Sequence, residues 1–159
     1  RKGIIIAVNK WDLVEKETQT AVEFTKKIRE ELKTFDYVPV VYVSAHTKQR
    51  ITKIVEIAKQ VLERRRTRLK TSELNKVLLP IFEQTPPPSI KGHDLRINYI
   101  TQVSTEPPVF AFFCNLPQML PDSYKRFMER IVREQFDFEG TPISFIFRRK
   151  NTPFEELER

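Results

Sequence analysis

The sequence predicts an α/β unit followed by an α+β unit, and three observations lead to this fold class. Two short apolar runs are each followed by an amphipathic helical pattern, which gives the order β-α-β-α. The pattern changes near residue 70, at the end of a dense basic run. The remaining patterns follow the order α-β-β-α-β. We therefore expect an α/β domain over residues 1–68 and an α+β domain over residues 71–159.

In the first unit, residues 4–8 and 38–43 are continuously apolar and β-branched, as is typical of parallel strands buried on both faces. Two helical stripes accompany them: Ala21, Phe24, Ile28 and Leu32, and then Ile51, Ile54, Val55, Ala58, Val61 and Leu62. Two strands are too few for a stable sheet of this kind. Because the chain also begins without Met, we expect a fragment of a longer protein, with the rest of the sheet upstream.

The second unit is predicted to begin with a helix capped by Thr71 or Ser72 and ended by the prolines at 86–88. Strands are expected around residues 95–99, where apolar positions alternate, and at residues 109–114. Asp122 is a good cap for the next helix. The last strand has alternating apolar positions at residues 143–147. These elements predict helices on one face of a three-stranded sheet.

Composition narrows the possible classes of protein. The chain has 159 residues and a net charge of +7. Residues 1–70 carry a net charge of +8 and residues 71–159 a net charge of −1. It has one cysteine, which cannot form an internal disulfide, and no apolar run of the roughly 20 residues that a membrane span needs. No secretory signal pattern opens it, so a cytoplasmic protein without a membrane partner is expected. His46 and His93 have no accompanying ligand cluster, so no metal site is predicted.

Basic residues form two groups that are candidates for contacts with RNA phosphates. The two groups are Arg64, Arg65, Arg66, Arg68 and Lys70, and Arg148, Arg149 and Lys150. Clustered cations suit a phosphate backbone. The first group is more typical of a solvated helix end, where cations also favour the C-terminal dipole, and the second is as typical of a solvated strand end. The sequence leaves both interpretations open.

Five polar or small residues follow the two predicted strands: Asn9, Lys10, Asp12, Ser44 and Ala45. Ligands of open α/β sheets bind outside the strand carboxyl ends, so one shared site is expected. Guanine offers donors at N1 and its 2-amino group beside the acceptor O6. Because a carboxylate only accepts, Asp12 suits both donors, and a backbone N–H of Ser44 or Ala45 suits O6. Asn9 would brace the loops or hold the base, and the Lys10 stem would lie along the base.

A plainer interpretation of these residues is a polar loop in which Asp12 caps a helix. The surrounding residues favour guanine binding, because a buried strand leads in and a second strand ending in Val-Ser-Ala follows.

The chain also resembles a known family. Asn9-Lys10-x-Asp12 and Val43-Ser44-Ala45 are similar to the fourth and fifth motifs of translation-factor-like GTPases. Five further strings resemble the bacterial double-Era GTPases, the Der or EngA family: AHTKQRI at 45–51, PPP at 86–88, NLP at 115–117, PDSYKRF at 121–127 and FEGTPI at 138–143. This resemblance implies the end of the second P-loop GTPase domain over residues 1–68, followed by a KH-like domain.

The resemblance further implies a GTP-hydrolysing factor in assembly of the large ribosomal subunit. Its ligands would be GTP or GDP with Mg²⁺, and its partners the large subunit, ribosomal RNA and the missing GTPase domains, with no DNA. With glycines only at positions 3, 92 and 140, the chain cannot hold a G-x-x-x-x-G-K-[ST] loop, so we expect no catalytic residue, no activity and no tightly bound nucleotide in this fragment. His46 and Lys48 depart from the family pattern.

Two other functions stay open. The second unit has no Gly-x-x-Gly clamp of the kind found in RNA-binding KH domains, and its apolar, proline-bound connection at residues 116–121 favours a protein-docking surface over a nucleotide clamp. An RNA- or ribosome-docking KH-like module is the first alternative. The chain could then be a docking module without nucleotide chemistry of its own. A nucleotide-binding regulator that does not hydrolyse GTP is the other alternative.

Overall fold

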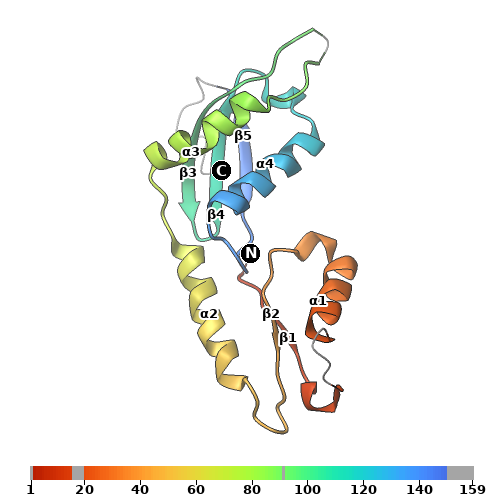
Figure 1. Ribbon diagram of the computed structural model, residues 1–159. Helices are drawn as coiled ribbons and strands as arrows, with labels where there is room; N and C mark the ends of the chain where they lie inside the picture. The colour runs from red at the N-terminus through yellow and green to blue at the C-terminus, as the bar shows by residue number, and fades with distance from the viewer. Residues whose placement is uncertain (1, 16–19, 91, 150–159) are drawn as a thin grey trace. The chain divides into compact units, whose positions relative to one another are not determined.

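The computed structural model describes residues 2–15, 20–90 and 92–149 (Figure 1). The chain divides into two compact units. The first contains the chain through Arg64 and also Phe138–Thr141, whereas the second contains Arg65–Asp137 and resumes at Pro142.

The first unit has a parallel pair of strands, each followed by a helix. Its elements are β1 (Ile6–Val8), η1 (Trp11–Leu13), α1 (Thr20–Glu31), η2 (Lys33–Phe35), β2 (Val40–Tyr42) and α2 (Ile51–Arg66), whose last two residues belong to the second unit. In the register, Ile6 pairs with Val40 and Val8 with Tyr42. The predicted order β-α-β-α is confirmed, although both strands are shorter than their apolar runs.

Apolar stripes of the first unit are only partly covered. Val61 is the buried residue of α2, whereas Val55 on the same helix is 56% exposed and α1 has no buried residue among those described. Ile4, at the start of the first apolar run, is also exposed. Two short strands offer too little surface to cover two amphipathic helices. The helical spacing was therefore predicted correctly, but it does not correspond to a closed core.

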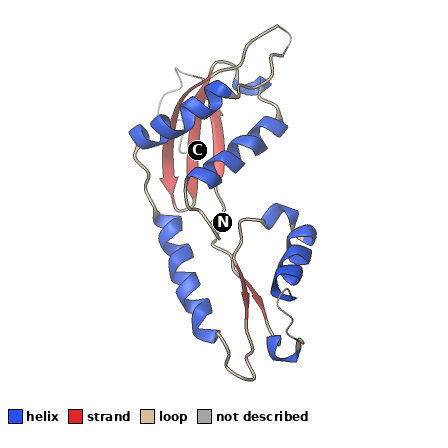
Figure 2. Ribbon diagram, viewed as in Figure 1, coloured by secondary structure: helices blue, strands red, loops and turns tan. Residues whose placement is uncertain are grey.

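The second unit has a three-stranded sheet with both of its longer helices on one face (Figures 1 and 2). Its elements are α3 (Thr71–Gln84), β3 (Ile97–Thr105), β4 (Pro108–Cys114), η3 (Pro117–Met119), α4 (Asp122–Gln135) and β5 (Ser144–Arg148). The strand order is β3-β4-β5, with β3 antiparallel and β5 parallel to β4. The predicted order α-β-β-α-β is confirmed.

Aromatic side chains fill the core of this unit. Phe112 of the central strand is fully buried and lies 4.9 Å from Phe145 and 6.2 Å from Phe82, measured between ring centroids. On the opposite face of β4, Ala111 and Phe113 are buried as well. A central strand covered on both faces explains why residues 109–114 are continuously apolar.

Side-chain amides protect the free edge of β3. Asn75 on α3 accepts the Ile100 N–H through Oδ1 at 2.9 Å and donates to the Ile100 carbonyl through Nδ2 at 2.7 Å. Gln102, which is 2% exposed, accepts the Leu69 N–H at 2.8 Å and donates to the Thr67 carbonyl at 3.0 Å. An exposed strand edge invites pairing with other chains. The Asn75 bonds satisfy the Ile100 backbone at this edge, whereas the Gln102 bonds tie the backbone of Thr67 and Leu69 to the Gln102 side chain.

Two local predictions in this unit were wrong. The expected alternation across Ile97 and Tyr99 is broken by a register shift, so that Tyr99 is exposed and Ile100 is buried. Such an irregularity redirects the following side chains. Neither predicted cap is used: α3 begins after Lys70, and Asp122 is the first residue of α4, where it pairs with Lys125 at 2.8 Å.

None of the described helices combines the length and apolarity that crossing a membrane would require.

Candidate functional site

A sharp turn carries the chain from β1 into the first polar motif. Lys10 has a φ of 59°, in the left-handed region, and η1 begins at the next residue. Trp11 is 4% exposed, and its ring lies 4.2 Å from Tyr42 and 5.5 Å from Phe24 between centroids. The aromatic contacts of Trp11 anchor the turn, while its neighbours Lys10 and Asp12 line a hollow in the surface.

The second loop, which follows β2, is closed by its own hydrogen bonds. The Ser44 N–H donates to the Gln49 carbonyl at 3.1 Å, and the Ser44 hydroxyl accepts the Thr47 N–H at 3.1 Å. Lys48 and Arg50 have φ values of 60° and 58°. Left-handed residues other than glycine are uncommon and costly, and they concentrate at functional loops. Ser44 is fully buried and therefore shapes this loop from inside.

Direct hydrogen bonds join the two loops. The Trp11 N–H donates to the Val43 carbonyl at 3.0 Å, and the Ala45 N–H donates to Asn9 Oδ1 at 3.0 Å. Between the loops lies a hollow of about 350 Å³, whose lining residues are Asn9, Lys10, Asp12, Leu13, Ala45 and His46. The structure thus brings together four of the five residues predicted to bind guanine and places the fifth, Ser44, behind them.

One detail of the site differs from the prediction. The Ala45 N–H, expected to serve guanine O6, is engaged by Asn9, and the Ser44 N–H is engaged by Gln49. A bound base would therefore have to replace Asn9 Oδ1 as the partner of Ala45, or find another donor for O6. Asp12, whose carboxylate only accepts hydrogen bonds, lines the same hollow.

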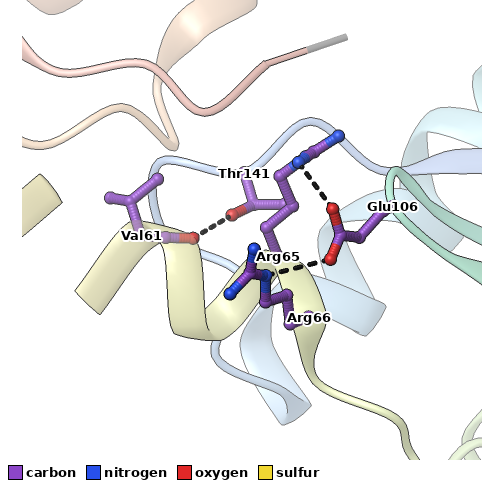
Figure 3. Close-up of polar contacts among 5 residues, drawn as sticks. All are labelled: Val61, Arg65, Arg66, Glu106 and Thr141. Atoms are coloured by element: carbon purple, nitrogen blue, oxygen red, sulfur yellow. Dashed lines mark hydrogen bonds and ion pairs between the residues drawn. The ribbon is translucent and has the colours of Figure 1, made fainter. Parts of the chain in front are cut away.

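The basic run at the end of α2 and just beyond it consists of two kinds of residue. One Glu106 oxygen lies 3.1 Å from Arg65 Nη1 and the other lies 2.9 Å from Arg66 Nε (Figure 3). Arg64 lies 3.3 Å from the Glu139 carboxylate. Arg68 and Lys70 are exposed and make no ion pair with any described residue.

The second basic group lies at the end of β5. Arg148 is half-buried and Arg149 is exposed, whereas Lys150 lies outside the described residues. No group of three or more His, Cys, Asp or Glu residues is placed to hold a metal ion in the part of the chain that the structure describes.

Two residues of these sites were missed in the sequence. Trp11 occupies the variable position of the first motif, and an aromatic residue there was the available signal for its anchoring role. Glu106 lies 40 residues beyond Arg66. No local pattern connects an exposed acidic residue in a hairpin loop with a distant helix end.

The α-β-β-α-β order and mixed three-stranded sheet define the second unit as a KH-like α+β domain. A comparison with protein families agrees: residues 68–148 match the KH-domain-like C-terminal domain of EngA bacterial GTPase enzymes. The chain belongs to this family.

Similar curated proteins include GTPase Der of Chloroherpeton thalassium, 51% identical over 150 residues, and GTPase Der of Christiangramia forsetii, 52% identical over 149 residues. GTPase Der of Flavobacterium psychrophilum is 51% identical over 150 residues. Each alignment covers 94% of this chain and 34% of the relative. The chain therefore spans about a third of the length of these relatives.

Proposed function

We propose that this chain is the base-reading and docking part of a GTP-binding, GTP-hydrolysing protein that acts in assembly of the large ribosomal subunit. The observation that supports this most directly is the hollow in which Asn9, Lys10, Asp12 and Ala45 meet at the ends of two parallel strands. The relatives are named as GTPases, which supports the GTP-hydrolysing part of the proposal. Phosphate and Mg²⁺ contacts would come from parts of a complete protein outside this sequence, which has no phosphate-binding loop.

In this proposal the residues of the hollow select guanine by complementarity of donors and acceptors. Asp12 accepts from N1–H and the 2-amino group, and its charge strengthens both bonds. Adenine would leave that carboxylate without donors, and a site built around such a pair discriminates strongly against the wrong base. Asn9 holds the second loop through Ala45, and buried Trp11 fixes the turn that carries Asp12.

The test is Asp12→Asn in a complete Der-family protein that carries this chain as its C-terminal part. Xanthine has an acceptor where guanine has the 2-amino donor, and an Asn amide can donate to it. We expect GTP affinity to fall by about 2–4 kcal/mol and XTP to become the better competitor. Competition between the two nucleotides for a labelled nucleotide analogue measures both changes.

Asp36→Asn is the matched control, because Asp36 is an exposed residue of the same unit that does not line the hollow. It should leave both affinities unchanged. If Asp12→Asn competes with GTP and XTP as the parent does, then Asp12 does not read the base.

A docking module without nucleotide chemistry is the second candidate. Exposed Arg68 and Lys70 favour it, together with the connection from Cys114 to α4, which contains η3 in place of a Gly-x-x-Gly clamp. Such a module would bind ribosomal particles equally well with or without guanine nucleotide. A complete protein whose particle binding changes between GTP and GDP would exclude this alternative.

A further inference from the structure

The turn Phe138–Thr141 belongs to the first unit, although the residues on both sides of it belong to the second. Its central residue joins the segments that lead into β1 and β2. The Ile4 N–H donates to the Gly140 carbonyl at 2.8 Å, and the Gly140 N–H donates to the Tyr37 carbonyl at 2.7 Å. One residue thus closes the space between the starts of two parallel strands.

The same turn also holds the end of α2. A Cβ on Gly140 would lie 2.5 Å from a Val61 methyl, and one on Gly3 would also collide with Val61. The Thr141 hydroxyl donates to the Val61 carbonyl at 3.3 Å (Figure 3). Phe138 and Thr141 are 2% and 0% exposed. Two of the three glycines in the chain therefore leave room for the side chain of Val61.

The strands that Gly140 joins end at the two loops of the proposed guanine site. Asn9 lies five residues after Ile4, which corresponds to about 17 Å of strand. Hydrogen bonds connect the two strands along this length. The β1–β2 pairing is followed by the bond from the Val43 N–H to the Val8 carbonyl at 2.9 Å. Beyond it come the bonds that the Trp11 and Ala45 N–H groups donate between the two loops. A two-stranded pair is marginal by itself, so its register depends on what holds its ends.

We propose that the turn Phe138–Thr141 is a positioning element for the guanine-reading loops, acting through β1 and β2. This inference rests on the proposed function only for the role of those loops. The connection from the turn to the loops is made by the hydrogen bonds of Gly140 and of the β1–β2 pair. The turn comes from the sequence between α4 and β5, so a disturbance that reaches it from the KH-like domain would be felt at the base-reading loops. Gly140 is the key residue, because its φ of 73° and its contact with Val61 leave no room for a side chain.

Hydrogen exchange in the 159-residue chain tests this inference. In Gly140→Ala we expect the exchange rates of the Trp11, Val43 and Ala45 amides to rise about tenfold or more, together with that of the Ile4 amide. A tenfold rise corresponds to a loss of about 1.4 kcal/mol in the free energy of opening the strand pair. The Leu32 amide, bonded to Ile28 within the first unit, is the internal reference and should rise less. Trp11, the one tryptophan of the chain, should show a changed emission maximum.

Gly92→Ala is the matched control. Gly92 has a similar φ of 76° but nothing within 4 Å of an added Cβ, so the variant carries the backbone strain without the collision. It should leave the amides of the first unit unchanged. If Gly140→Ala does not fold, Thr141→Val removes the bond to Val61 while keeping the shape, and should give the same pattern at about threefold.

Faster exchange confined to Ile4 would overturn the proposal and make the turn a local clamp. An equal rise at Leu32 would also overturn it, because it would show general unfolding of the unit. Base selectivity plays no part in these measurements. A failure here and a failure of the Asp12→Asn test are therefore distinguishable.

Discussion

The two kinds of basic residue at the end of α2 and just beyond it should affect RNA binding differently. We compare two double variants. The first combines Arg68→Gln and Lys70→Gln, and the second combines Arg65→Gln and Arg66→Gln. Each removes two positive charges from the same unit. The first pair is exposed without an ion pair among the described residues, whereas both arginines of the second pair share the single carboxylate of Glu106, with the Arg65 side chain 14% exposed.

The magnitude follows from counterion release. Each cation that neutralises an RNA phosphate contributes about 0.7–0.9 to the slope of log affinity against log salt concentration. If Arg68 and Lys70 each contact a phosphate, their double variant should flatten the slope by about 1.4–1.8. The Arg65 and Arg66 variant should change the slope by well under half of that. Glu106→Gln, which releases both arginines, should steepen it.

Fluorescence anisotropy with a labelled structured RNA, titrated at several KCl concentrations, measures the slopes. Because phosphate contacts carry no sequence information, an unrelated RNA should show the same losses. Equal slopes for the parent and the Arg68/Lys70 variant would show that the basic run is a solvated helix end. A strong preference for one short RNA sequence, abolished by changes at residues 116–121, would contradict the docking proposal.

Three further outcomes are expected. Burial raises the pKa of Cys114 to about 11, about two units above an ordinary thiol, so its reaction with Ellman's reagent at pH 8 should be about a hundredfold slower than in urea; equal rates would contradict its burial. Asn75→Ala should cost the second unit about 2–4 kcal/mol in urea unfolding, since it leaves the Ile100 N–H and carbonyl without partners, whereas Asn98→Ala, on an exposed residue, should cost little. The purified chain should not hydrolyse GTP, and a rate matching a complete GTPase would refute the division of labour proposed above.

Element order could be predicted from the sequence because each element has its own periodicity. Runs such as residues 109–114 and stripes such as that of α4 depend only on neighbouring residues and on one buried face. Strand limits and the β3 irregularity could not be predicted in this way. They depend on which backbone groups find partners in other strands, as Ile100 does through Asn75.

The candidate guanine site was predictable for a related reason. Its residues follow two parallel strands directly, and such strands bring their carboxyl ends to one edge. The bond between Asn9 and Ala45 was not predictable, because an Asn amide in a loop has several partners within reach. The division of the basic run was hidden too, since Glu106 and Glu139 are distant in sequence.

The positions of the glycines in the sequence exclude one kind of site, but they do not reveal why each glycine is needed. The glycines at 3, 92 and 140 are never five residues apart, as the two glycines of a phosphate-binding loop must be, and the sequence alone supports that exclusion. In the structure, Gly3 and Gly140 have a positive role, because each lies against Val61 where a side chain would collide. These residues come from the start of the chain, the end of α2 and the turn before β5. A glycine required by close packing leaves no local pattern, since its reason is a neighbour brought close by the fold. For the same reason Gly140 is the position where a single methyl group should report on the base-reading loops.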